Sequence, residues 1–269
     1  MQLVGVVLTL LLLTGCGGTA NRPAGPQGEG QSRGPSPSPS TSPTSAPSSS
    51  ASARLTTARC ADLVVLGLRG QGQSARGHHG AGRDADGVMR AMLPHLRHGT
   101  TLRIEGVPYP ARSGGDAAYS EDVRTGVRLV DDQLTELRKN CPSSRVGLVG
   151  YSEGAEVVHR AATAAGAGRL AVVVLMGDPQ RNPADPVATL RLGTAALTGQ
   201  GNGGVGARFP DAVRHEVLEV CAQGDDVCNA PPTGRVGPPS ATHRAAYKHW
   251  ATQRRVAVEA ARVVVGGGG

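Results

Sequence analysis

The chain has 269 residues, a net charge of +7 and only 2% aromatic residues. Its basic residues are scattered and lack aromatic neighbours that could stack on bases, which argues against nucleic acid as a partner. An anionic cell envelope is a simpler reason for a basic surface. With so few aromatic side chains, any core must consist mainly of Val, Leu and Ala.

The first sixteen residues have the pattern of a lipoprotein signal peptide. Residues 3–14 are nearly all apolar, and Gly15 and Cys16 follow them. The run is too short to span a bilayer comfortably, which favours a cleaved signal over a transmembrane helix. No Lys or Arg precedes it, although signal peptides normally begin with positive charge. We predict a signal over 1–16 with lipidation at Cys16; a plain signal peptide with an unrelated cysteine is the alternative.

The segment that follows differs sharply in composition from the rest. Residues 17–54 are rich in Pro, Ser, Thr and Gly, with almost no bulky apolar side chains. Such a segment cannot bury enough surface to offset the entropy of ordering, so we predict a disordered tether. Residues 55–265 suffice for one domain with a sizeable core, and residues 266–269 form a glycine tail.

Short apolar runs alternate with amphipathic stretches along this domain. The runs predict buried strands at 61–68, 101–107, 145–149, 170–176 and 216–221. Helices are predicted at 84–97 and at 243–264. A third helix, which ends near Asn140, is predicted from an apolar face formed by Val123, Val127, Val130, Leu134 and Leu137. The Gly-rich stretch 193–208 is predicted to be a mobile loop. The alternation predicts a mostly parallel sheet covered on both faces, with ligands at the carboxyl ends of its strands.

Four cysteines remain after Cys16: Cys60, Cys141, Cys221 and Cys228. An even number behind an export signal implies two disulfides in an oxidising compartment, with three connectivities. Cys221 and Cys228 are close in sequence and flank a Gly-Asp turn, which favours a local pair and leaves Cys60 and Cys141 to close a long loop. The chain has no CxxC or HxxxH spacing that would favour zinc instead.

The most informative motif is Gly150-Tyr151-Ser152-Glu153-Gly154, which lies between a predicted strand and a predicted helix. A Gly-x-Ser-x-Gly sequence in this setting is typical of a nucleophile elbow, a turn so tight that small residues must flank the serine. We therefore predict Ser152 as a nucleophile. The alternative is an ordinary turn with a surface serine.

A serine nucleophile needs a base, and the base needs an acid that orients it. Four histidines follow Ser152: His159, His215, His243 and His249. His159 is expected to point away from the site, whereas His243 and His249 follow the last strand, where the Ser–acid–His order places the base. Asp225 and Asp226 lie between Cys221 and Cys228, in a loop that could hold a carboxylate in place.

Several motifs, taken in order from residue 60 to residue 247, resemble the cutinase family of serine esterases. They are Cys60, Leu68-Arg69-Gly70-Gln71, Tyr109-Pro110-Ala111, Cys141-Pro142, the Ser152 motif, Gly177-Asp178-Pro179, Cys221, Gly224-Asp225-Asp226-Val227-Cys228 and His243-Arg244-Ala245-Ala246-Tyr247. The resemblance implies an α/β-hydrolase-like three-layer sandwich without a large lid. It also implies a mechanism that needs no metal or cofactor.

The resemblance also assigns roles to individual residues. It implies Ser152 as nucleophile, His243 as general base and Asp225 as the acid. The backbone N–H groups of Gln71 and Glu153 would form an oxyanion hole, which stabilises the charge of the transition state. The implied disulfides are Cys60–Cys141 and Cys221–Cys228.

Three positions depart from the family pattern. Glu153 replaces the usual Gln and places a carboxylate next to the oxyanion hole. Gln71 replaces Ser or Thr. The last motif has one extra residue between His243 and Tyr247, which keeps His249 as an alternative base.

We therefore expect a monomeric serine carboxylesterase that acts on acyl esters or lipids. It would be secreted, or held at the outer face of the cell membrane through Cys16. Two alternatives remain: a catalytically weakened surface protein that binds through the same fold, and another acyl hydrolase such as a thioesterase, since reaction class depends on the pocket.

Overall fold

The computed structural model describes residues 51–164, 170–231 and 238–267. The predicted signal over 1–16 with Cys16, most of the tether and the last two glycines lie outside these residues. Arg54, the last residue assigned to the tether, pairs with Thr101 at the edge of the sheet. Within the described ranges, no helix is both long and apolar enough to cross a membrane.

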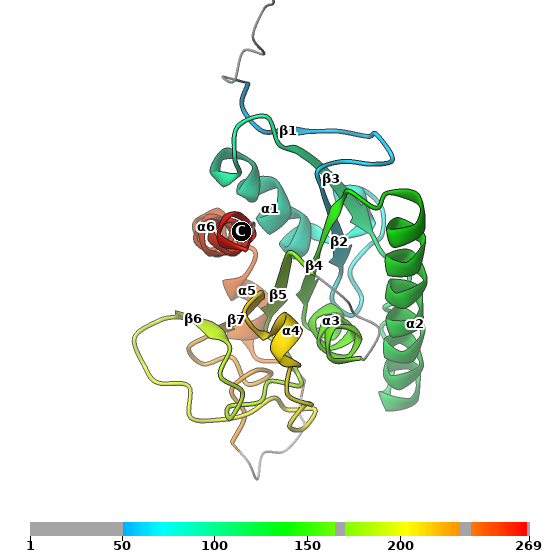
Figure 1. The fold of residues 1–269 in the computed structure, drawn as a ribbon. Helices are drawn as coiled ribbons and strands as arrows, with labels where there is room; N and C mark the ends of the chain where they lie inside the picture. Colours follow the sequence, from blue (N-terminus) through cyan, green and yellow to red (C-terminus); the bar gives the residue numbers. More distant parts are fainter. Residues whose placement is uncertain (1–50, 165–169, 232–237, 268–269) are drawn as a thin grey trace, which may run out of the picture. The chain divides into compact units, whose positions relative to one another are not determined.

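A seven-stranded sheet forms the centre of the domain (Figure 1). Its strands lie in the order β1-β3-β2-β4-β5-β7-β6, and each adjacent pair is parallel. Their bounds are β1 Arg54–Leu55, β2 Leu63–Leu68, β3 Thr101–Gly106, β4 Arg145–Tyr151, β5 Val172–Met176, β6 Ala188–Leu192 and β7 Val217–Ala222.

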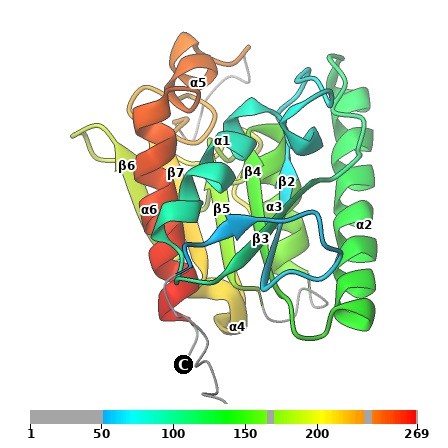
Figure 2. The same cartoon turned by 90° about the horizontal axis from the view of Figure 1, so that it is seen from above.

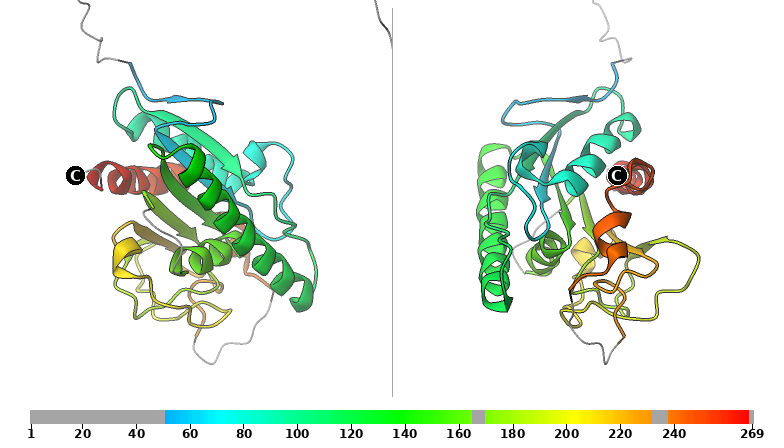
Figure 3. Two further views of the ribbon diagram at one scale, coloured as in Figure 1. Left: turned by 45° about the vertical axis from the view of Figure 1, so that its right-hand side comes forward. Right: turned by 180° about the vertical axis from the view of Figure 1, so that it is seen from behind.

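Helices cover both faces of this sheet, which confirms the predicted three-layer α/β architecture (Figures 1 and 2). The helices are α1 Arg83–Met92, α2 Asp116–Asn140, α3 Glu153–Thr163, α4 Asp211–Arg214, α5 Ala241–Ala246 and α6 Trp250–Gly266, with short 3-10 turns at His78–Gly80 and Leu93–His95. α2 and α3 pack on one face, and α1 and α6 pack on the other (Figure 3).

The burial of the strands follows from this layering. Every residue of β2, β5 and β7 is buried, and their sequences are apolar apart from Glu219 in β7, as expected of strands covered on both faces. The edge strand β6 is different, because all of its residues are exposed or half-buried and Thr189 and Arg191 interrupt its apolar side chains. The sequence predicts no strand there, since an exposed edge strand has no apolar run.

The C-terminal helix is the main correction to the predicted elements. The sequence predicts one helix over 243–264, but the structure has two, α5 and α6, separated at Tyr247–His249. Tyr247 is fully buried, and its hydroxyl accepts a hydrogen bond from the Ala222 amide. His249 has extended backbone angles and is the N-cap residue of α6. The break therefore lets α5 turn toward the end of β7.

Two disulfides form among the described residues, one between distant parts of the domain and one local. Cys60 bonds to Cys141 across 81 residues, which ties the start of β2 to the end of α2. Cys221 bonds to Cys228 across seven residues and closes a loop at the end of β7. These are the pairings that the family resemblance implies. The stretch 193–208, predicted to be a mobile loop, is instead held by backbone hydrogen bonds, among them Gly203 N–H to the Pro179 carbonyl.

Candidate active site

Ser152 lies at the turn between β4 and α3, at the carboxyl end of the central strand of the sheet. Its φ angle of 56° is in the left-handed region, which is costly for a residue with a side chain and is typical of a nucleophile elbow. A Cβ on Gly150 would lie 2.3 Å from the Gly154 carbonyl oxygen, and a Cβ on Gly154 would lie 2.3 Å from that of Leu68. Only glycine fits at either position, so the motif is a steric requirement of this turn.

His243 is the histidine that reaches this serine. Its Nε2 lies 2.9 Å from Ser152 Oγ, and its side chain is 2% exposed. The Ser240 hydroxyl accepts a hydrogen bond from the His243 backbone N–H and caps α5. On the other side of the imidazole, the Tyr151 ring stacks at 5.2 Å, and its hydroxyl donates to the His243 carbonyl. The ring is therefore held by its own helix cap and by a residue next to the serine.

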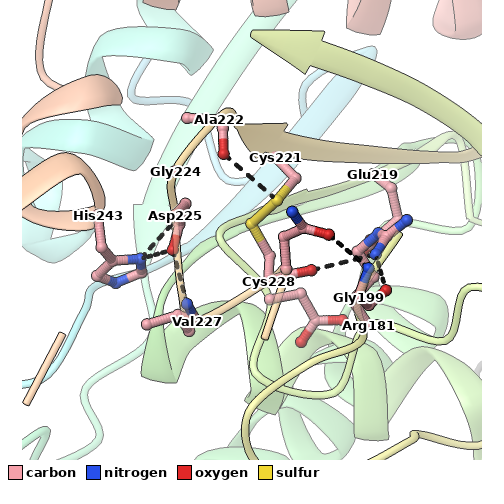
Figure 4. The surroundings of a disulfide bond; sticks show 12 residues. Arg181, Gly199, Glu219, Cys221, Ala222, Gly224, Asp225, Val227, Cys228 and His243 are labelled. Carbon is pink, nitrogen blue, oxygen red and sulfur yellow. Dashed lines mark hydrogen bonds and ion pairs between the residues drawn. A yellow bond between two sulfur atoms is a disulfide. The ribbon is translucent and has the colours of Figure 1, made fainter. Parts of the chain in front are cut away.

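Asp225 links the disulfide loop to His243 (Figure 4), and His243 in turn contacts Ser152. Both of its carboxylate oxygens lie 3.0 Å from His243 Nδ1. The same carboxylate accepts hydrogen bonds from the Val227 backbone N–H at 2.8 Å and from the Tyr247 hydroxyl at 2.5 Å. Asp226 faces elsewhere and accepts from the backbone N–H of Ser240. The structure thus brings Ser152, His243 and Asp225 together and leaves Asp226 outside the group.

The other histidines lie away from Ser152. His215 and His249 are exposed at helix ends. His159 is buried, with Nδ1 2.6 Å from the Asp178 carboxylate and Nε2 2.9 Å from the Ala207 carbonyl oxygen. Both partners are acceptors, so both ring nitrogens must carry protons. Burial lowers the pKa of His159, but the Asp178 carboxylate, together with the Ala207 carbonyl and Asp185, more than offsets burial and raises this pKa above its usual value.

The loop with Gln71 follows β2 and borders the serine. The Arg69 guanidinium is buried and donates to the carbonyls of Val107, Tyr109 and Pro110, which fixes this loop to the segment after β3. The Gly72 N–H donates to the Ala111 carbonyl, which connects the same two segments. Gln71 is exposed, and its side-chain amide donates to the Gly114 carbonyl.

Glu153 follows Ser152 directly, with its backbone N–H at the start of α3 and its side chain buried. As the first residue of α3, it has an N–H without an acceptor inside the helix. Its side chain is 0% exposed, and neither carboxyl oxygen has a hydrogen-bond partner within the described residues. Burial, reinforced by Asp122 and Glu156, raises the pKa of Glu153 to about 8.

A pocket of about 370 Å³ opens at Ser152. Its lining mixes polar and apolar residues, which come from the loop after β2, from the segment before α2, from α2 and α3, and from the loops after β5, β6 and β7. The lining residues are Gln71, Gly114, Asp116, Tyr119, Ser152, Glu156, Pro179, Asn202, Gly203, Val227, Pro238 and Pro239.

One cluster near the site has metal-ligand residue types. Possible ligand atoms of Cys221, Asp225 and Cys228 lie within 4.8 Å of one another. The two sulfurs are bonded to each other and so cannot serve as thiolate ligands. In this cluster the Cys221–Cys228 disulfide therefore fixes the loop that carries Asp225.

Three residues of this site are not singled out by the sequence reasoning. Tyr151 and Tyr247 hold the base and the acid, and Arg69 fixes the Gln71 loop. All three belong to the motifs quoted above, so the signal was present. Their roles depend on contacts across 22 to 92 residues of chain, which no local pattern reports.

Comparison with known proteins identifies what this arrangement is similar to. The family model described as Cutinase matches residues 59–256. A cutinase of Pyricularia oryzae is 30% identical over 183 residues, which cover 64% of this chain and 71% of that protein.

Two solved structures share the fold at 20% identity. An acetylxylan esterase has a TM-score of 0.57 over 77% of this chain and 98% of its own. A cutinase-like protein from a Cryptococcus species has the same TM-score over 77% of this chain and 96% of its own.

Proposed function

The chain belongs to the cutinase family and is a carboxylic ester hydrolase, and we propose that it cleaves acyl esters through Ser152, His243 and Asp225. The observation that carries this proposal is the continuous line of hydrogen bonds from Asp225 through His243 to the Ser152 hydroxyl. A surface protein that only binds through this fold would have no need of it.

Catalysis begins when Ser152 Oγ attacks the ester carbonyl carbon and His243 Nε2 takes its proton. Asp225 holds the imidazole in the required tautomer and stabilises the imidazolium. The backbone N–H groups of Gln71 and Glu153 bind the negative oxygen of the tetrahedral intermediate. The C–O bond to the alcohol then breaks, and His243 returns the proton to the leaving oxygen. A water molecule, activated by the same histidine, hydrolyses the acyl-enzyme and restores Ser152.

The pocket favours esters with short acyl groups. Its lining includes the polar side chains of Gln71, Asp116, Tyr119, Glu156 and Asn202. A long alkyl chain would desolvate these groups without giving them hydrogen bonds, which is unfavourable. We therefore expect acetyl and butyryl esters to be better substrates than palmitoyl esters.

The two disulfides fit an extracellular protein. We propose that the chain is exported as a monomer and held at the cell surface by a lipid on Cys16. This cysteine follows an apolar run of the length expected for a cleaved signal.

The test is hydrolysis of p-nitrophenyl esters of two to sixteen carbons by the oxidised protein. Ser152→Ala is the control, and an acyl thioester of matched length distinguishes a thioesterase. Activity on short esters that disappears in Ser152→Ala supports the proposal. Activity equal in the two proteins, or confined to the thioester, would overturn it.

A further inference from the structure

Glu153 combines two features that are rarely found in one residue. Its backbone N–H is a proposed oxyanion donor, and its carboxyl group is fully buried with no hydrogen-bond partner among the described residues. Buried carboxylates are normally paired, because an unpaired charge in the interior is costly. The unpartnered carboxyl therefore indicates a group that is neutral in the folded protein.

The charged and titratable groups around Glu153 come from each element packed against it. They are Asp122 and Tyr119 of α2, Glu156 of α3, Arg69 after β2, and Tyr109 and Arg112 after β3. The two carboxylates oppose ionisation of Glu153, and the two arginines favour it.

Both arginines are already engaged by other acceptors. Arg112 contacts the Asp122 carboxylate at 2.7 Å and Glu121 at 2.7 Å. Arg69 donates to backbone carbonyls. Glu156 is itself paired with Arg160 at 2.6 Å and accepts from the Tyr119 hydroxyl at 2.7 Å. If Glu153 were ionised, it would be a third carboxylate beside Asp122 and Glu156, and neither arginine would be available to pair with it.

We propose that Glu153 is a protonation-dependent positioning residue, whose neutral form leaves the oxyanion hole intact and whose ionised form opposes the charge of the tetrahedral intermediate. The inference rests on the proposed function. The carboxylate is on the same residue as the N–H that would bind the developing oxyanion, and it lies in an interior where charges interact strongly. Substrate binding precedes that charge, so the ionised form lowers kcat and leaves KM nearly unchanged.

The pH at which this occurs follows from the burial of the group. Since burial raises the pKa of Glu153 to about 8, the neutral form dominates at pH 7 and the ionised form dominates above pH 9. We expect kcat to fall by about tenfold across this range, the effect of one opposing charge near the transition state.

The test is the pH profile of p-nitrophenyl acetate hydrolysis from pH 5 to 10, corrected for spontaneous hydrolysis, for the full chain and Glu153→Gln. The glutamine keeps the shape and cannot ionise. We expect the alkaline fall in kcat to disappear in Glu153→Gln while KM changes less than twofold. A fall that persists unchanged, or a change confined to KM, would overturn the proposal.

Glu219→Gln is the matched control. Glu219 lies on β7 and is also buried, neither of its carboxyl oxygens has a hydrogen-bond partner among the described residues, and burial raises its pKa as well. Unlike Glu153, it has a cation beside it, since Arg181 Nε lies 3.5 Å from its carboxylate. In this variant kcat should still fall at alkaline pH. If the fall in kcat disappeared in Glu219→Gln as well, any buried acid would have the same effect, and the proposal would be overturned.

A second measurement covers the case in which Glu153→Gln does not fold. In Glu219→Gln, the infrared carbonyl band of the protonated Glu153 carboxyl should disappear between pH 7 and 9. Its loss should follow the same pH dependence as the fall in kcat. A band that titrates elsewhere would overturn the proposal. If no Ser152-dependent activity exists at any pH, the proposed function itself fails, so the two failures are distinguishable.

Discussion

The two disulfides should separate stability from activity. In the chain-entropy account, a loop of 81 residues stabilises the folded state by about 4.5 kcal/mol and a loop of seven by about 2.4 kcal/mol. We therefore expect Cys60→Ala/Cys141→Ala to lose about 2 kcal/mol more stability than Cys221→Ala/Cys228→Ala.

Activity should respond in the opposite order. The Cys221–Cys228 loop holds Asp225, whose carboxylate orients His243 only while the loop is fixed. The Cys60–Cys141 bond lies at the other end of the strands, at the start of β2. We expect kcat to fall at least about tenfold when the short loop is opened, because small misplacements of catalytic groups are costly, and to change less than twofold when the long loop is opened.

The assay is urea unfolding at 25 °C for the free energy, with p-nitrophenyl acetate turnover at the same temperature, where both variants are folded. The single-cysteine variants would form mixed disulfides, so the double variants are compared directly with each other. Greater stability loss in the short-loop variant, or full activity without Cys221–Cys228, would refute the reasoning.

Three further predictions concern single side chains. Tyr247→Phe removes one of the donors to Asp225 and should lower kcat about tenfold with little change in KM, as measured by steady-state kinetics. Glu153 has a folded-state pKa raised from 4.5 to about 8, so its contribution to stability is present below pH 4.5 and lost as pH rises to 8. In urea unfolding, Glu153→Gln should thus gain up to about 5 kcal/mol over wild type between pH 4.5 and 8; parallel pH profiles would contradict this. The raised pKa of His159 makes its pair with Asp178 stabilising below pH 6.5 and weaker as pH rises. His159→Gln should therefore lower stability by about 3 kcal/mol at pH 6 and by less at pH 10, and an equal loss at both would count against the ion pair.

The nucleophile elbow was predictable because its physics is local. Gly150 and Gly154 contact backbone within a few residues of Ser152 or on the adjacent strand, so the spacing alone reports the turn. The buried strands β2 and β5 were predictable for the same reason, since each is a short apolar run.

The remaining features depend on tertiary contacts. Nothing in the sequence 243–264 breaks a helix, and the break occurs because Tyr247 is drawn into the core against Asp225 and Ala222. Composition and spacing leave both Asp225 and Asp226 open, and only the family resemblance selects Asp225. In the structure the choice depends on which carboxylate faces His243. The burial of Glu153 is equally invisible to a pattern, because an acidic residue in the first turn of a helix is normally solvated.

The central claim is that Ser152 is the nucleophile of this hydrolase. The most direct test is reaction with a p-nitrophenyl alkylphosphonate, in which Ser152 Oγ bonds to phosphorus, p-nitrophenolate leaves and His243 takes the proton. We predict one equivalent of p-nitrophenolate and a single adduct, located by mass spectrometry on the peptide that contains Ser152, with no adduct in Ser152→Ala. An adduct on another residue, or equal labelling of Ser152→Ala, would contradict the account.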